Sequence, residues 1–395
     1  MDRATQIGLL DRVVEHFRSG VQDMESTPSS FQAGVYCDET RARRESATLF
    51  SNFPLVVGAS VQIPDAGSYI TREINGVPIL VSRQADGSVR GFLNICRHRG
   101  SRLVVAETGT CKRSHVCAYH GWTYGIDGTL RAIRHPENFD GIDPEVSSLV
   151  PLATGETAGL IFVVPNPRSS CDIDAYLGQY GRELTGFGLR EFQWYEGRTV
   201  RTKHDWKLTI EANQETYHFG VLHRTTAGRR FRGTSTLFDP HGPHSRTLMM
   251  HKRFHARSLP ESKDDWRLLE HGDLAYCLFP NTIVLLSHFA AHVLTVLPDG
   301  LGQALVYGFT LLPPGTRDAY RSEFFDVYWS TMGEDIEMLE TIQTSAKAMP
   351  ETVWWRGRNE HLLRRFNESI DAAVAGDLTA NSVATDLGPF APPVS

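Results

Sequence analysis

The 395-residue sequence has no run of eighteen apolar residues, so we expect no membrane-spanning helix. It has no excess of basic residues: the net charge of −6 argues against binding to nucleic acid or to an anionic membrane surface. Its six cysteines are scattered, which is unlike a disulfide framework and typical of a reducing, cytoplasmic location. The sequence also lacks a Gly-x-Gly-x-x-Gly dinucleotide fingerprint and a Cys-x4-Cys-x2-Cys ferredoxin pattern.

Two short Cys/His pairs are the most informative feature that is present. Cys96-Arg97-His98 is followed, after eighteen intervening residues, by Cys117-Ala118-Tyr119-His120. Two thiolates and two imidazoles suit either a tetrahedral zinc site or a [2Fe–2S] cluster with two Cys on one iron and two His on the other. Each pair is followed by a glycine, Gly100 or Gly121, which permits a tight turn at a loop tip. Two similar loops that clamp a cluster from opposite sides favour the iron–sulfur interpretation.

The motifs CRHRG and CAYHGW resemble the signature of a Rieske domain. This resemblance implies that Cys96, His98, Cys117 and His120 hold a [2Fe–2S] cluster in a small antiparallel β-sandwich. Short β-rich segments from about residue 53 to 165 are consistent with such a sandwich, and Pro165–Ser170 is typical of a linker.

The pattern changes after the linker. Three segments alternate like strands (282–287, 292–297 and 304–312), and residues 317–349 carry apolar side chains at helical spacing. We therefore predict an α+β fold, in which a catalytic domain of antiparallel sheet covered by helices follows the Rieske domain. The predicted divisions are an N-terminal helical segment that packs on the catalytic domain (1–39), the Rieske domain (40–166) and the catalytic domain (167–395).

A second candidate metal site lies in a predicted helix from about Lys207 to His218. His218 and His223 are five residues apart, a spacing that does not place them on one face of a regular helix. The helix must therefore end or distort between them if both bind one ion. Rieske oxygenases carry a similar His-x4-His motif just after an acidic residue. The resemblance implies that these two His bind a mononuclear Fe(II), with a distant carboxylate completing a facial triad that leaves positions open for O2.

The long helix offers four candidates for that carboxylate: Glu334, Asp335, Glu337 and Glu340. Asp335 lies on the apolar stripe of the helix, where a buried carboxylate needs a partner such as a metal ion. Glu334 and Glu337 are expected on the solvent side. The related family places its ligand in an Asp-x4-Glu pattern, which Asp335 and Glu340 match. We predict Asp335 as the third iron ligand.

Glu215 stands three residues before the first iron His, where most of the related family has aspartate. The resemblance implies that this acid joins the iron site to the Rieske cluster of a neighbouring subunit. Glutamate at this position is similar to the branch that acts on quaternary ammonium compounds such as carnitine and betaines. A carboxylate that accepts a hydrogen bond from an imidazole on each side serves this role with either chain length.

Taken together, the motifs resemble the terminal oxygenase of a multicomponent Rieske non-haem iron system. The resemblance implies a homotrimer or a multiple of it, and a separate reductase that carries flavin and uses NAD(P)H. It also implies O2-dependent monooxygenation of a small quaternary ammonium or betaine-type substrate, including demethylation or C–N cleavage. Ring hydroxylation or cis-dihydroxylation of an aromatic acid is the alternative, and a Rieske electron carrier without oxygenase activity is a remote one.

Residues 224–257 hold eight Lys and Arg against a single acidic residue, Asp239. This basic segment either receives an acidic electron donor or a substrate carboxylate, or it forms a solvated loop.

Overall fold

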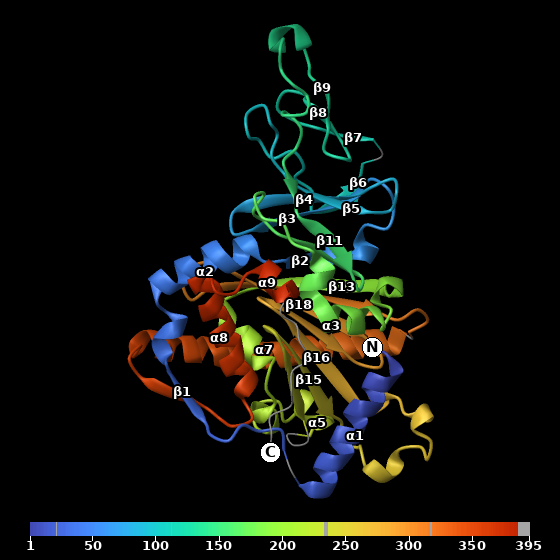
Figure 1. Cartoon of the computed structure of the whole chain (residues 1–395), viewed down its shortest axis with the longest axis vertical. Helices are drawn as coiled ribbons and strands as arrows, with labels where there is room; N and C mark the ends of the chain where they lie inside the picture. The colour runs from blue at the N-terminus through green and yellow to red at the C-terminus, as the bar shows by residue number, and fades with distance from the viewer. Residues whose placement is uncertain (21, 112, 233–235, 317, 386–395) are drawn as a thin grey trace.

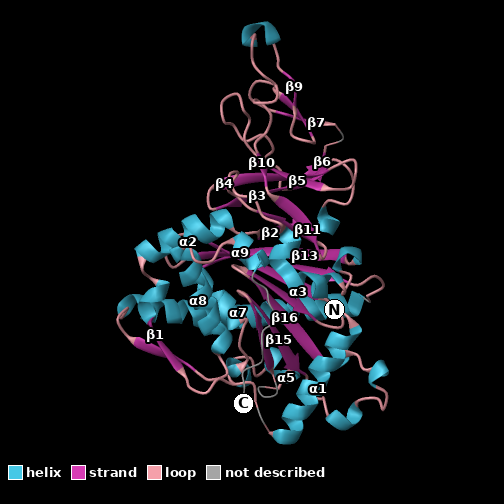
Figure 2. Ribbon diagram, viewed as in Figure 1, coloured by secondary structure: helices cyan, strands magenta, loops and turns pink. Residues whose placement is uncertain are grey.

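The computed structural model describes residues 1–385 apart from 21, 112, 233–235 and 317, and it places a narrow β-rich body on a broader one (Figure 1). The narrow body contains strands β2 to β12, and the broader body is a sheet with helices around it (Figure 2). The predicted α+β fold class, with a β-sandwich followed by an antiparallel sheet and helices, is confirmed.

The narrow body consists of small antiparallel sheets. Their strand orders are β10-β5-β4-β3-β6, β11-β12-β2 and β7-β8-β9. The strand bounds are β2 (Leu55–Ala59), β3 (Ser68–Ile74), β4 (Val77–Arg83), β5 (Val89–Leu93), β6 (Thr108–Thr110), β7 (Ser114–Val116), β8 (Thr123–Gly125), β9 (Leu130–Ala132), β10 (Pro151–Leu152), β11 (Thr154–Thr157) and β12 (Leu160–Val163). Every residue of β2 and β12 is buried, because these strands also face the broader body.

The broader body is built on a seven-stranded antiparallel sheet. Its order is β13-β19-β18-β17-β16-β15-β14. The strand bounds are β13 (Gln193–Thr202), β14 (Leu237–His241), β15 (His244–Met250), β16 (Gly272–Leu278), β17 (Thr282–Leu286), β18 (Ala291–Pro298) and β19 (Ala304–Leu312). The turn after Pro298 closes β18 and β19 into a hairpin, with Pro298 opposite Ala304. Near-continuous apolar runs in β16 to β19 reflect burial of both faces of the sheet.

Helices pack around this sheet, and a two-stranded ribbon borders it (Figure 2). The helix bounds are α1 (Arg3–Ser19), α2 (Glu39–Asn52), α3 (Ile173–Thr185), α4 (Trp206–Ala212), α5 (Ala227–Arg230), α6 (Leu268–His271), α7 (Asp318–Ala348), α8 (His361–Ala375) and α9 (Ala380–Thr385), and the ribbon joins β1 (Ser29–Gln32) to β20 (Val353–Arg356). Asp38 caps α2 by accepting a hydrogen bond from the Arg41 amide at 2.7 Å. Helix α1 lies on the broader body, where Arg12 pairs with Asp239 at 2.7 Å.

Two of the four buried apolar clusters among the described residues join the two bodies and support the Cys/His loops. The main core runs from β2 and β12 through α3 into the large sheet, so the two bodies share one apolar interior. A smaller core at the outer end of the narrow body includes Phe92, Trp122, Tyr124 and both motif cysteines, Cys96 and Cys117. The loops that carry the Cys/His pairs therefore rest on a packed base.

Candidate functional site

The two Cys/His pairs lie on two loops with the same backbone turn. The Gly100 amide donates to the Cys96 carbonyl and the Gly121 amide donates to the Cys117 carbonyl, each at 2.9 Å. Both glycines have φ = 74°, in the left-handed region where a side chain would be strained. The repeated turn explains why each pair is followed by glycine, and it lets the loops approach each other.

The four side chains of these loops converge. The rings of His98 and His120 have centroids 4.5 Å apart, and Cys96 and Cys117 are each only 2% exposed. Nδ1 of His98 is buried without a hydrogen-bond partner among the described residues. An unpaired buried nitrogen is costly unless it has another ligand. The residues present therefore fit a [2Fe–2S] cluster with two Cys and two His ligands.

Other side chains shield this site and bond to its sulfurs. Trp122 stacks on His98 with centroids 5.1 Å apart. The Tyr124 hydroxyl lies 3.5 Å from Sγ of Cys96, and the Ser101 hydroxyl lies 3.2 Å from Sγ of Cys117. Burial raises the pKa of Cys117, but the Ser101 hydroxyl and nearby backbone amides outweigh it, so the net shift of the pKa is downward. Such contacts favour thiolates, which are the ligand form of cysteine.

The second site brings His218, His223 and Asp335 together at the broader body. Nε2 of His223 lies 3.1 Å from Nε2 of His218 and 3.0 Å from Oδ1 of Asp335, and the third edge, from His218 to Asp335, is 3.6 Å. Donors bound at right angles to one ion at about 2.1 Å lie about 3 Å apart, so these atoms have the spacing of a facial triad. All three predicted residues fit one mononuclear metal ion.

The backbone reaches this arrangement differently from the prediction. The prediction that the helix extends to about His218 is wrong, because α4 ends at Ala212. His218 lies instead in a short 3-10 helix, Tyr217–Gly220. Because the chain leaves the α-helix before either His, the five-residue spacing no longer separates the two imidazoles. Gly228 packs under this segment, where a Cβ atom would lie 2.3 Å from the Phe219 carbonyl oxygen and 2.6 Å from that of His223. A glycine is required for this close approach.

The carboxylates of α7 have different environments. Asp335 is 7% exposed and faces both imidazoles, whereas Glu337 is exposed. Glu340 accepts a hydrogen bond from the Lys203 amide at 2.9 Å. The prediction that Glu334 faces solvent is wrong, because its Oε2 atom lies 2.6 Å from Nδ1 of His223. Helical spacing alone could not reveal this contact, since the partner arrives from a distant loop.

Glu215 contacts the other iron-site imidazole. Its Oε1 atom hydrogen-bonds Nδ1 of His218, and its Oε2 atom accepts from the amides of Tyr217 and His218. Two apolar side chains of the adjoining segment are exposed, Tyr217 by 73% and Val221 by 81%. An acid that holds an imidazole of this site beside exposed apolar side chains suits a contact with another macromolecule.

The structure separates core residues from exposed residues both among the aromatic side chains of the second domain and within the basic segment 224–257. Among the aromatic residues of the second domain, Tyr276, Phe279 and Trp329 belong to the main core, whereas Tyr217 points to solvent. In the basic segment 224–257, Arg246 is buried between Glu183 at 2.6 Å and Asp239 at 2.7 Å, so it does not belong to a basic surface. Within the described residues of segment 224–257, the exposed Lys and Arg are Arg224, Arg229, Lys252, Arg253 and Arg257.

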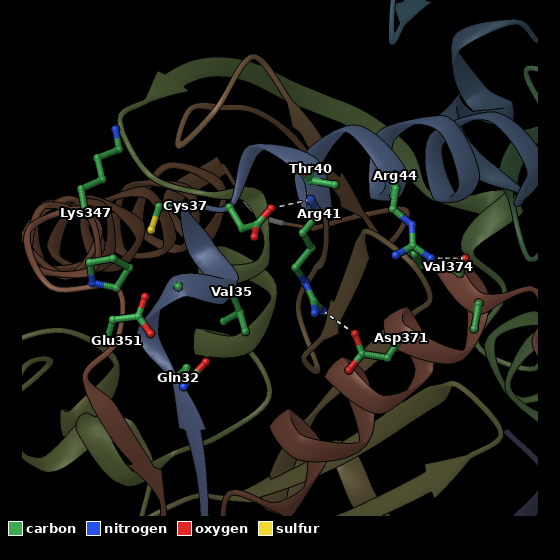
Figure 3. A pocket seen from close by; sticks show the side chains of 14 residues that line it. Gln32, Val35, Cys37, Thr40, Arg41, Arg44, Lys347, Glu351, Asp371 and Val374 are labelled. Atoms are coloured by element: carbon green, nitrogen blue, oxygen red, sulfur yellow. Dashed lines mark hydrogen bonds and ion pairs between the residues drawn. The ribbon is translucent and has the colours of Figure 1, made fainter.

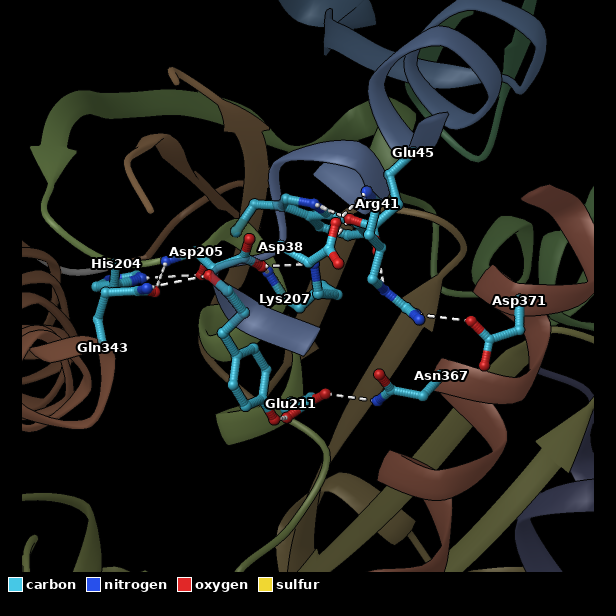
Figure 4. Close-up of polar contacts among 12 residues, drawn as sticks. Asp38, Arg41, Glu45, His204, Asp205, Lys207, Glu211, Gln343, Asn367 and Asp371 are labelled. Atoms are coloured by element: carbon cyan, nitrogen blue, oxygen red, sulfur yellow. Dashed lines mark hydrogen bonds and ion pairs between the residues drawn. The ribbon is translucent and has the colours of Figure 1, made fainter. Parts of the chain in front are cut away.

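A buried polar network holds the start of α4, two turns before the iron-site segment (Figure 4). Lys207 is 1% exposed, and its Nζ atom lies 2.7 Å from Glu45 and 2.9 Å from Asp205. Burial raises the pKa of Asp205 to about 6 despite the nearby ammonium. Arg41 then links Glu45 at 2.6 Å to Asp371 of α8 at 2.8 Å. The network ties α2, α4 and α8 together, and no periodic pattern in the sequence marks Lys207 as a buried residue.

A surface cavity of about 900 Å³ lies beside this network, between α2 and the ends of α7 and α8 (Figure 3). Its charged lining is balanced, with three basic and three acidic side chains: Arg41, Arg44, Lys347, Asp38, Glu351 and Asp371. The residues that line it belong to neither metal-donor set.

Comparison with known proteins identifies both domains. Residues 53–151 match the Rieske [2Fe-2S] domain, and residues 189–376 match the ring hydroxylating alpha subunit (catalytic domain). The glycine betaine monooxygenase oxygenase subunit of Pseudomonas aeruginosa is 33% identical over 228 residues, which are 56% of this chain and 52% of that protein. The carnitine monooxygenase oxygenase subunit of Escherichia coli is 30% identical over 53% of this chain and 55% of that protein. The chain thus aligns with about half the length of these curated relatives.

The fold is also similar to that of solved structures. The quaternary ammonium Rieske monooxygenase CntA, in complex with L-carnitine, superposes with a TM-score of 0.75 over 89% of this chain and 96% of that chain, at 21% identity. Within the described residues, no helix is both long enough and apolar enough to cross a membrane.

Proposed function

Because the chain joins a Rieske [2Fe–2S] domain to a ring-hydroxylating α-subunit catalytic domain, we propose that it is the terminal oxygenase component of a multicomponent Rieske oxygenase. The observation that carries this proposal is the presence of two different metal-donor sets in one chain, one of two Cys and two His and one of two His and Asp335. An electron carrier needs only the first set. The boundaries that we propose remain 1–39, 40–166 and 167–395.

The cluster held by Cys96, His98, Cys117 and His120 would take up single electrons, and the ion held by His218, His223 and Asp335 would supply O2 activation. The chain's own groups then do the remaining work. Glu215 and Glu334 each hold the Nδ1 side of an iron-site imidazole, which leaves both Nε2 atoms directed at the metal position. No dinucleotide motif is present in the sequence, so a separate reductase with flavin and NAD(P)H is the proposed electron source.

Electrons would pass between subunits rather than within one chain. The loops of the Cys/His pairs adjoin β7 and β8 at one end of the long axis, whereas α5, which follows His223, lies toward the other end (Figure 1). Glu215 lies beside exposed Tyr217 and Val221, where a neighbouring Rieske domain can dock. A head-to-tail ring closes such a heterologous contact, so we propose a homotrimer or a multiple of it.

For the substrate, we propose a quaternary ammonium or betaine-type compound that is monooxygenated at a methyl carbon next to nitrogen. Glu215 in place of aspartate and the similarity to oxygenase subunits named for glycine betaine and carnitine support this class. The ring-hydroxylating family match supports the alternative, oxidation of an aromatic acid.

Oxygen uptake tests the proposal. The holoenzyme, supplied with a generic flavin reductase and NADH, is tested with a panel of betaines and a panel of aromatic acids. We expect substrate-dependent O2 consumption with at least one betaine. Uptake with aromatic acids alone would replace the substrate class, and a cluster that is reduced but supports no uptake with any substrate would indicate an electron carrier.

A further inference from the structure

Glu334 makes a contact that neither metal-ligand motif accounts for. Its Oε2 atom lies 2.6 Å from Nδ1 of His223 and accepts a hydrogen bond from the Thr226 hydroxyl at 2.7 Å. On the opposite side of the same imidazole, Nε2 lies 3.0 Å from Oδ1 of Asp335. Adjacent residues of α7 therefore reach the two ring nitrogens of one histidine.

We propose that Glu334 is a positioning residue of the iron centre, which holds a proton on Nδ1 of His223 and thereby keeps Nε2 as the metal ligand. A neutral imidazole has one N–H group, and an ionised carboxylate can only accept, so the contact places the proton on Nδ1. The remaining lone pair on Nε2 then points toward His218 and Asp335. This inference rests on the proposed function only for the identity of the metal.

Burial makes the contact necessary. The His223 side chain is 0% exposed, so its Nδ1 proton depends on the Glu334 carboxylate as its acceptor, and truncation of Glu334 removes that acceptor. The imidazole would then be free to turn or to carry its proton on Nε2, and either change removes a metal ligand. Loss of such a partner usually weakens metal binding by about 10- to 100-fold.

The two carboxylate–imidazole pairs of the site divide the work. Glu334 accepts hydrogen bonds from His223 and from Thr226 of its own chain. Glu215 holds His218 and lies next to exposed Tyr217 and Val221, where it can also reach a neighbouring subunit. Glu334 therefore acts on retention of iron within its own chain, whereas Glu215 both holds an iron-site imidazole and lies where it can act in electron transfer from a neighbouring subunit.

Metal affinity measured without turnover tests this division. The cluster-loaded variants Glu334→Ala, Glu334→Gln and Thr226→Val are compared with Glu337→Ala, an exposed acid on the same helix that serves as the matched control. Mononuclear iron is followed by competition with a graded chelator and by the electron paramagnetic resonance signal of the Fe(II)–nitric oxide complex, and the visible spectrum of the cluster reports the fold.

We expect Glu334→Ala to bind iron about 10- to 100-fold more weakly, with the cluster spectrum unchanged. The amide oxygen of Glu334→Gln still accepts from Nδ1, so a smaller loss with an altered resonance line shape is expected, and Thr226→Val should lie between this variant and the control. Unchanged affinity and line shape in Glu334→Gln and Glu334→Ala, or an equal loss in Glu337→Ala, would overturn the proposal. If Glu334→Ala does not fold, Glu334→Gln and Thr226→Val decide. Because no substrate or O2 is used, a protein that oxidises nothing would refute the proposed function and leave this result standing.

Discussion

Replacing Lys207 by methionine tests how the buried network supports the catalytic segment. Methionine has a similar length and volume, so the change removes the ammonium group with little loss of packing. Glu45 and Asp205, 1% and 4% exposed, would then remain in the interior without their shared cation. The charge imbalance, and not a cavity, is therefore the perturbation.

The magnitude follows from the partners that remain. Removing one member of a buried ion pair costs about 3–5 kcal/mol. Glu45 keeps Arg41 at 2.6 Å and the Trp206 indole N–H at 3.2 Å, which limits its cost. Asp205 has a folded pKa of about 6, above its usual value, so its protonated form is favoured in the fold. The Lys207 ammonium holds this pKa down, so the pKa of Asp205 rises further in the variant, and the carboxyl is protonated and cheaper to bury at low pH but ionised and unpaired at high pH. We therefore expect a loss of about 3 kcal/mol at pH 8 and less at pH 5.

Thermal unfolding at both pH values, followed by circular dichroism, measures the effect. In a chain of 395 residues, a loss of that size should lower the apparent melting temperature by roughly 4 °C at pH 8. Lys203→Met is the matched control, because Lys203 is exposed four residues earlier in the same segment. An equal melting temperature for Lys207→Met and Lys203→Met at pH 8, or a larger deficit at pH 5 than at pH 8, would refute this reasoning.

Two further predictions concern the iron ligand and the pH dependence of the fold. Asp335→Ala should lower the iron content from three to two per chain and stop turnover with an intact cluster spectrum, since only the mononuclear site loses a ligand; the prediction fails if Glu337→Ala does this and Asp335→Ala stays active. Burial lowers the pKa of His244 to about 4, and its neutral ring accepts from the Phe279 amide at 3.0 Å and donates to the Tyr176 carbonyl at 2.9 Å. A depressed folded pKa gives stability that is present above pH 6.5 and is lost as pH falls through 4, by about 3 kcal/mol. The free energy of unfolding in urea should therefore depend less on pH for His244→Gln than for the wild type over this range. An equal pH dependence of the two proteins would contradict a neutral, buried His244.

Features encoded by local pattern were predictable from the sequence. Strand β19 has the predicted bounds, Ala304–Leu312, because alternating β-branched and aromatic residues specify a strand wherever they are packed. Helix α7 runs over Asp318–Ala348, within one residue of the predicted span at each end. Its apolar stripe also placed Asp335 on the buried face, since helical phase determines which side chains share a face.

Features that depend on distant segments were not predictable. Helix formers continue beyond Ala212, yet α4 ends there and the chain bends toward α7. The same phase that located Asp335 misplaced Glu334, because the loop of His223 and Thr226 covers a face that an isolated helix would expose to solvent. Lys207 was unrecognisable as a buried cation, since its partner Glu45 lies 162 positions earlier in the chain. Tertiary contacts of this kind leave no periodic signal in the sequence.

Glu215→Gln tests the central claim, that electrons pass from the cluster of one subunit to the iron of the next through this residue. The glutamine amide cannot hold two imidazoles as a carboxylate does, although it can keep the contact with His218. The measurement is single-turnover reoxidation of the chemically reduced cluster by O2 with substrate bound, followed by stopped-flow absorbance, in a protein whose oligomeric state is established by sedimentation. The account predicts a trimer with all three irons per chain, unchanged substrate binding and a severely slowed reoxidation rate. An undiminished rate in Glu215→Gln, or a monomer that turns over at the full rate, would contradict it.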